Sequence, residues 1–192
     1  MDKIFQYPDK EFTLSELAKE AKVAKQNMKK ILSELNNAKI IETSRLGKKI
    51  WQIKGRQEEW KFIRHKIAYN LNFIYKSNLI NVLDEVFDRP KSIILFGSFR
   101  YGKDISISDI DIAIETSHVN KYSIIKSEDK IFNNRQKELL KKIEYEIERK
   151  FEFHLFPKVR LSDKEFRETF ISILNGLIIS GFLDIRDETR KN

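Results

Sequence analysis

Residues 91–115 read KSIILFGSFRYGKDISISDIDIAIE, and this stretch decides the fold of the part of the chain around it. It begins with an apolar strand pattern, Lys91 to Phe96, which ends at Gly97. A second strand pattern covers Ile110 to Ile114, and residues 98–103 are expected to begin a short helix between the two strands. This order of strand, tight turn, helix and strand predicts that helices pack on a sheet.

Two carboxylates stand one residue apart at the second strand. Because side chains alternate along a strand, Asp109 and Asp111 are expected to point to one side, while Ile110, Ile112 and Ile114 point into the core. Two carboxylates this close repel each other unless a cation lies between them. A hard divalent cation such as Mg²⁺ (or Mn²⁺) prefers oxygen ligands and would fit. The alternative is the plain solvent-exposed face of an edge strand.

The turn Gly97-Ser98 has residue types that suit an anion. A glycine lets backbone N–H groups approach a phosphate closely, and a helix that starts just after it adds unpaired N–H groups. Ser98 adds a hydroxyl donor. Gly-Ser alone is more typical of an ordinary strand-to-helix turn than of a phosphate site.

Together, these residues resemble the signature of the minimal nucleotidyltransferases of the DNA polymerase β superfamily. That signature is a hydrophobic strand, Gly-Ser, a second glycine and then Ser-Asp-hydrophobic-Asp. It falls here on Gly97, Ser98, Gly102, Ser108, Asp109, Ile110 and Asp111. The resemblance covers about residues 90–160. It implies transfer of a nucleoside monophosphate from an NTP, with ATP favoured, to a hydroxyl group with release of pyrophosphate.

The resemblance also implies roles for individual residues. Asp109 and Asp111 would hold Mg²⁺ or Mn²⁺ and take part in catalysis. Members of this superfamily often carry Arg where this chain has Tyr101, so the flanking Arg100 and Lys103 are expected to serve the triphosphate instead. The predicted nucleotide-binding residues are Gly97, Ser98, Arg100, Gly102, Lys103 and Ser108.

A third carboxylate is implied on the next strand of the sheet, here Phe151 to Phe156. Alternation leaves Glu152 and His154 on the face opposite to the apolar residues, and Glu152 is predicted as the third acid, a metal ligand or a base for the hydroxyl. The alternative is an exposed glutamate beside an exposed histidine. Weaker candidates are Glu144, Glu146 and Glu148 on the preceding helix, predicted from Glu128 to Lys150.

The N-terminal residues follow a different pattern. Thr13 to Glu16 reads as a capping box before a short helix, a second helix is expected from Ala24 to Asn37, and two short strands are expected at residues 40–43 and 49–53. Helix, turn, helix and hairpin is the order of a winged helix-turn-helix, and residues 15–41 resemble that family.

Basic charge is concentrated in the same segment. Residues 1–56 hold 13 Lys and Arg against 7 Asp and Glu, whereas the whole chain has a net charge of +8. We therefore predict that this domain binds DNA, with the second helix in the major groove; protein docking and a structural role are the alternatives. The predicted DNA-binding residues are Lys25, Gln26, Asn27, Lys29, Lys30, Arg45, Lys48 and Lys49.

The remaining segments complete the predicted organisation. Residues 1–56 form the winged helix-turn-helix, 57–89 a linking helix, and 90–192 a nucleotidyltransferase domain whose last helix runs from Ser162 to about Ser180. The apolar part of that helix could form a homodimer face. No apolar run reaches the roughly 18 residues that span a membrane, and the absence of Cys excludes disulfides and thiol chemistry. We expect a cytoplasmic protein without a membrane partner.

The predicted fold class is therefore α+β, with a mixed sheet flanked by helices in the C-terminal part. The predicted function is a metal-dependent nucleotidyltransferase that modifies a protein or an RNA, with DNA bound by its N-terminal domain. The protein acceptor could be a cognate toxin, because small members of the superfamily occur as antitoxins. The alternative is a winged-helix transcriptional regulator whose C-terminal domain only binds nucleotide.

Overall fold

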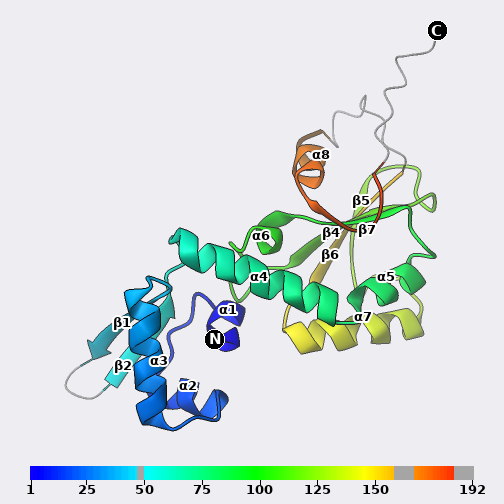
Figure 1. The fold of residues 1–192 in the computed structure, drawn as a ribbon. Helices are drawn as coiled ribbons and strands as arrows, with labels where there is room; N and C mark the ends of the chain where they lie inside the picture. The colour runs from blue at the N-terminus through cyan, green and yellow to red at the C-terminus, as the bar shows by residue number, and fades with distance from the viewer. Residues whose placement is uncertain (47–49, 158–166, 184–192) are drawn as a thin grey trace. The chain divides into compact units, whose positions relative to one another are not determined.

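The computed structural model describes residues 1–46, 50–157 and 167–183 of the chain (Figure 1). Its residues fall into two units, each with an apolar core of its own. The first unit comprises residues 1–70 and 102–107, and the second comprises residues 71–101 and 108–192.

The first unit begins with three helices followed by a hairpin. The helices are α1 (Asp2–Gln6), α2 (Leu14–Glu20) and α3 (Lys25–Asn37), and the strands β1 (Ile41–Leu46) and β2 (Ile50–Gly55) pair antiparallel. The predicted capping box is confirmed, because the Thr13 hydroxyl accepts from the Glu16 N–H while the Glu16 carboxylate accepts from the Thr13 N–H. The two predicted helices and the hairpin are present, whereas α1 was not predicted.

Apolar residues at helical and strand spacing form the core of this unit. Met28 and Leu32 of α3 lie one turn apart and are buried together with Ile41 and Ile53 of the hairpin. Phe62, near the start of α4 (Trp60–Lys76), is fully buried in the same cluster.

The helical pattern of residues 57–88 consists of two helices, α4 and α5 (Leu79–Val86). They are separated at Ser77 and Asn78, where the Ser77 hydroxyl accepts a hydrogen bond from the Leu79 N–H. A serine that bonds to its own neighbouring backbone competes with the helical hydrogen bonds, which explains why α4 ends here.

A buried ion pair holds residues 102–107 within the first unit. The Lys66 Nζ lies 2.8 Å from Oδ2 of Asp104, and both side chains are only 1% exposed. The Asn70 amide donates to the other oxygen of Asp104, Oδ1, at 2.8 Å. The segment that lies in the sequence between Ser98 and Asp109 is thereby fixed to helix α4.

The second unit contains a five-stranded sheet in the order β5-β6-β4-β3-β7. β4 and β6 run parallel, and all other neighbours in this sheet are antiparallel. The strands are β3 (Ser92–Leu95), β4 (Ile110–Glu115), β5 (Ser123–Lys126), β6 (Phe151–Phe156) and β7 (Leu177–Gly181). The helices that follow α5 are α6 (Gly97–Arg100), α7 (Asn134–Ile147) and α8 (Arg167–Leu174). The predicted mixed sheet flanked by helices is confirmed for this part of the chain.

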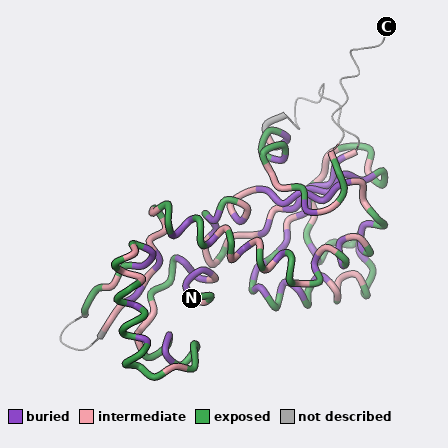
Figure 2. Tube along the Cα trace, in the orientation of Figure 1, coloured by how far each residue is buried: buried purple, intermediate pink, exposed green. Residues whose placement is uncertain are grey.

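Helix α8 lies on one face of the sheet and helices α5 and α7 lie on the other (Figure 1), and the central strands are largely buried (Figure 2). Ile112 and Phe153 belong to the cluster that includes α5 and α7, whereas Ala113 and Phe156 belong to the cluster that includes α8. Because both faces are covered, the centre of the sheet is buried, and chemistry is confined to the ends of the strands.

The predicted last helix is wrong in its second half. α8 ends at Leu174, and Leu177–Gly181 forms strand β7, which pairs antiparallel with β3. The physical reason is the edge of β3 that β4 leaves unpaired. Residues 177–179 are apolar and rich in β-branched isoleucine, which favours a strand, and the backbone of that strand pairs with the edge of β3. Gly176 permits the approach, since a Cβ at this position would lie 2.6 Å from Cγ2 of Ile94. The predicted helix start, Ser162, lies outside the described residues.

Among the described residues, every helix is too short or too polar to cross a lipid bilayer.

Replacement of Asp104 by Ala is expected to destabilise the protein by about 3–5 kcal/mol, because it leaves the Lys66 ammonium buried without its counter-charge. Urea unfolding of the wild type and the variant measures the difference. The matched control is Glu42→Ala, whose carboxylate is exposed and 3.8 Å from Lys54, so that its loss should cost less than about 1 kcal/mol. Equal effects of the two substitutions would contradict the account of this ion pair.

Candidate active site

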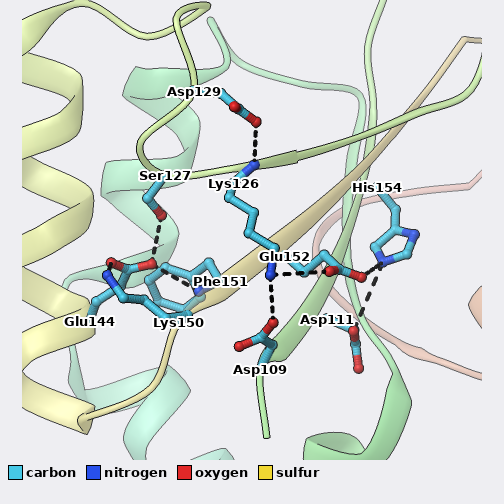
Figure 3. Close-up of polar contacts among 10 residues, drawn as sticks. All are labelled: Asp109, Asp111, Lys126, Ser127, Asp129, Glu144, Lys150, Phe151, Glu152 and His154. Atoms are coloured by element: carbon cyan, nitrogen blue, oxygen red, sulfur yellow. Dashed lines mark hydrogen bonds and ion pairs between the residues drawn. The ribbon is translucent and has the colours of Figure 1, made fainter.

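The parallel register of β4 and β6 places two carboxylates side by side. Asp111 and Glu152 are direct partners in this register, and Asp109 immediately precedes β4 (Figure 3). Ile110 and Ile112, which flank Asp111, are fully buried, as the alternation predicted. The structure therefore brings together three predicted acids, Asp109, Asp111 and Glu152, called the acidic cluster from here on.

The Gly97 turn lies directly against this cluster. Gly97 has a φ of +69°, and a Cβ at this position would lie 1.9 Å from Oδ2 of Asp111. The Phe96 N–H also donates to the Asp111 carbonyl oxygen at 3.1 Å. Glycine is thus required both by the left-handed backbone and by the neighbouring carboxylate. The predicted phosphate turn and the predicted metal ligands are neighbours in space.

Lys126 provides positive charge for the acidic cluster (Figure 3). Its Nζ lies 3.0 Å from Oδ2 of Asp109 and 3.7 Å from Oε2 of Glu152. The hydrogen bond to Asp109 and the charge of that carboxylate raise the pKa of Lys126. Sequence reasoning missed this residue, because the short strand β5 that carries it was not predicted; its only sequence signal is the apolar pair Ile124-Ile125 before the lysine.

His154 is a buried neighbour of the same carboxylates. The alternative interpretation of Glu152 made His154 an exposed residue, but His154 is only 6% exposed, because the helix α8 layer covers its face of the sheet. Its Nε2 lies 3.2 Å from Oε1 of Glu152 and 3.9 Å from Oδ1 of Asp111. Burial lowers the pKa of His154, although the Glu152 charge opposes this.

The surroundings of Asp111 perturb its ionisation. Burial raises its pKa from 3.8 to about 6, and the negative charges of Glu152 and Asp109 act in the same direction. A cation bound beside these carboxylates would relieve their mutual repulsion and favour the ionised form of Asp111.

Glu144 positions the strands from outside the cluster. Its Oε1 accepts from the Ser127 hydroxyl at 2.7 Å and from the Phe151 N–H at 2.9 Å, and its Oε2 accepts from Lys150. Ser127 directly follows Lys126, and Phe151 directly precedes Glu152, so that one carboxylate fixes both functional side chains (Figure 3). Glu146 and Glu148, the other weaker candidates for the third acid, are exposed on and just after α7.

The residues predicted to contact the triphosphate lie in varied environments. Ser98 and Ser108 are half-buried, and Arg100 has a buried Nε without a hydrogen-bond partner among the described residues. The Tyr101 hydroxyl donates to the Asn175 carbonyl oxygen at 2.7 Å. This hydroxyl therefore bonds to the protein's own backbone and does not take over the phosphate contact implied for the arginine often found there.

Gly102 and Lys103 belong to the first unit. Gly102 has a φ of +64°, and a Cβ there would lie 2.9 Å from the Ile63 carbonyl oxygen of α4, which explains the glycine without a ligand. Lys103 is exposed.

The donor atoms of the site fit a divalent cation. Asp111, Glu152 and His154 each offer one ligand atom, and these three atoms lie within 4.8 Å of one another. Two carboxylate oxygens and an imidazole nitrogen are ordinary ligands of divalent metals in proteins. Asp109, the third predicted ligand, is paired with Lys126.

The predicted DNA-binding residues lie in the first unit. On α3 they are all exposed: Lys25, Gln26, Asn27, Lys29 and Lys30. Arg45 of β1 is exposed, and the cationic groups of Arg45 and Lys29 lie 5.0 and 5.9 Å from the Trp51 ring centre. Lys48 and Lys49 lie outside the described residues.

Comparison with protein families gives one match relevant to this geometry. A family model described as "Nucleotidyltransferase domain" matches residues 76–174, which contain the acidic cluster and the Gly97 turn. Neither the curated proteins nor the solved structures contain a match to the chain.

The raised pKa of Asp111 predicts a specific dependence of stability on pH in metal-free buffer. Because the pKa is higher in the folded than in the unfolded protein, the stabilisation from this group is complete below about pH 4 and is lost as the pH rises through about 6. Asp111→Asn should therefore raise the melting temperature relative to wild type at pH 7 by more than it does at pH 4. A difference in melting temperature between Asp111→Asn and wild type that does not change with pH would refute the prediction.

Proposed function

This chain belongs to the nucleotidyltransferase domain family, and on that premise we propose that it transfers a nucleoside monophosphate from an NTP, ATP in the first instance, to a hydroxyl group of a protein or an RNA. The observation that carries the proposal is the pairing of Asp111 with Glu152 across β4 and β6, with Asp111 packed against a glycine turn that has no space for a Cβ. A site of this kind provides cation ligands and a phosphate cradle within one small region.

The proposed reaction has a simple balance of bonds. The oxygen of the acceptor hydroxyl forms a bond to the α-phosphorus, the bond from that phosphorus to the oxygen bridging to the β-phosphate breaks, and pyrophosphate leaves. The hydroxyl proton passes to a carboxylate of the acidic cluster. Divalent Mg²⁺ or Mn²⁺ would supply charge neutralisation for the phosphate oxygens.

The chain's own residues would position the NTP. Gly97 and Ser98 would present backbone N–H groups and a hydroxyl to the phosphates. The Arg100 guanidinium, whose Nε lacks a partner among the described residues, would offer donors to the same anion. Lys126 would limit the repulsion between the acidic cluster and the triphosphate, because it already lies between Asp109 and Glu152.

A second activity is supported by the first unit. We propose that it is a winged helix-turn-helix that binds DNA through the exposed face of α3, because five polar or basic residues in its first two turns are free of the core. The rival proposal, a transcriptional regulator whose second unit binds nucleotide without turnover, shares this DNA-binding activity and differs only in the absence of transfer.

Transfer can be measured with α-labelled ATP, Mg²⁺ or Mn²⁺, and pools of candidate protein and RNA acceptors. Asp111→Ala should lower labelling by about a thousandfold, because several kcal/mol of charge stabilisation depend on the cluster and each 1.4 kcal/mol is a factor of ten. Glu146→Ala, which removes an exposed carboxylate of α7, is the matched control and should label normally. Binding of ATP by the wild type without labelling of any acceptor would favour the regulator.

DNA binding should depend on the lysines of α3. Replacement of Lys25, Lys29 and Lys30 by Ala should weaken binding and reduce the slope of log affinity against log salt by about 3, because each phosphate contact contributes about 0.9. The charge-matched control replaces Lys130, Lys141 and Lys142 by Ala, three exposed lysines of the second unit. Equal losses for both variants, measured by fluorescence anisotropy with duplex DNA, would contradict a specific role for α3.

A further inference from the structure

One imidazole nitrogen of the site is buried and faces carboxylates. The Nε2 atom of His154 makes no hydrogen bond of good geometry within the described residues, and His154 as a whole is 94% buried. An unpaired buried nitrogen costs free energy, so its position requires an explanation. It is directed at carboxylates, at 3.2 Å from Oε1 of Glu152 and 3.9 Å from Oδ1 of Asp111 (Figure 3).

We propose that His154 is a nitrogen ligand of the divalent cation, which makes the cation site of this chain a mixed one formed by Asp111, Glu152 and His154. The inference rests on the proposed function, since it concerns the metal of that reaction. The ligand atoms lie within 4.8 Å of one another, a spacing that a single ion can bridge after small side-chain adjustments.

The two oxygens of Glu152 face different cationic partners. Oε2 is 3.7 Å from the Lys126 ammonium, whereas Oε1 faces His154. Lys126 therefore neutralises the side of the cluster next to Asp109. Among the residues that the structure describes, the side next to Asp111 has an imidazole and no cationic side chain beside it. That second side is the position where a cation would be most strongly stabilised.

Tyr122 allows the imidazole to bind metal through Nε2. The Tyr122 hydroxyl and Nδ1 of His154 are 2.5 Å apart, and a hydroxyl can either donate or accept. Without metal, the hydroxyl donates to Nδ1 and the proton on Nε2 faces Glu152. With a cation bound, the imidazole proton would instead be on Nδ1, whose N–H would donate to the Tyr122 oxygen, and the Nε2 lone pair would be free to act as a ligand. A second-shell bond of this type orients metal-binding histidines, and the Phe96 ring, edge-on at 4.8 Å, restricts the imidazole further.

A mixed donor set has a consequence for metal choice. Mg²⁺ favours an all-oxygen environment, whereas Mn²⁺ and later transition metals accept imidazole readily. We therefore expect the full-length protein to bind Mn²⁺ more tightly than Mg²⁺, and this preference to decrease when His154 is removed.

The test uses the full chain with MnCl₂ and no nucleotide. Pulsed electron paramagnetic resonance should detect modulation from a directly coordinated ¹⁴N in the wild type, and the pattern should change to that of ¹⁵N when the protein is labelled with ¹⁵N-histidine. The isotope exchange leaves folding untouched. His154→Leu should abolish the nitrogen coupling and weaken Mn²⁺ binding at least tenfold, while His118→Leu, at an exposed histidine, should change neither.

Two results would overturn the inference: bound Mn²⁺ with no nitrogen coupling in the wild type, or coupling that persists in His154→Leu. Failure of the proposed function is separable from both. Nitrogen coupling in a protein that transfers no nucleotide would refute the reaction and keep the ligand, whereas transfer by a protein without the coupling would refute the ligand and keep the reaction.

Discussion

The parallel register between β4 and β6 is the constraint on which the site depends. It sets Asp111 beside Glu152, and it does so against Gly97, where even one added carbon would collide with the Asp111 carboxylate. The register is fixed from both sides. Below the sheet, alternate isoleucines and phenylalanines of the two strands are buried against α5 and α7, and a slip by one residue would expose them all. At the strand ends, the Glu144 carboxylate accepts hydrogen bonds from Ser127, which follows Lys126, and from the N–H of Phe151, which precedes Glu152.

The same arrangement is electrostatically unfavourable for the metal-free protein. Three acids and one buried imidazole share a small region in which Lys126 is the cation that contacts the carboxylates. Burial and like charges raise the pKa of Asp111 to about 6, and Nε2 of His154 makes no hydrogen bond of good geometry within the described part of the chain. Perturbed groups of this kind concentrate at functional sites. These groups do not favour the stability of the metal-free fold. A bound cation would neutralise the carboxylates and give Nε2 of His154 a partner, and a phosphate anion could bind beside that cation.

The parts of this site that the sequence reveals are those set by local geometry. Asp111 lies on β4 and Asp109 immediately precedes that strand, so alternation alone orients them, and Glu152 follows from the same rule applied to Phe151 and Phe153. The position of Lys126 beside the cluster depends on β5 pairing with β6, and the burial of His154 depends on the layer that covers the sheet. Both features arise from residues far apart in the sequence, so local patterns do not predict them. The helix predicted through Ser180 failed for the same reason, because the open edge of β3 decides that Leu177–Gly181 is a strand. Likewise, Gly102 looks like part of a phosphate motif, yet its contact with the α4 backbone is visible only in the fold.

The central claim is that the acidic cluster and the Gly97 turn together bind a cation and a triphosphate. The most direct measurement is a crystal structure of the protein with Mn²⁺ and a non-hydrolysable ATP analogue, with data collected at a wavelength where manganese scatters anomalously. The account predicts an anomalous peak within about 2.5 Å of carboxylate oxygens of Asp111 and Glu152, with phosphate oxygens at the N–H groups of Gly97 and Ser98. A well-occupied analogue bound elsewhere, or manganese remote from these carboxylates, would contradict it.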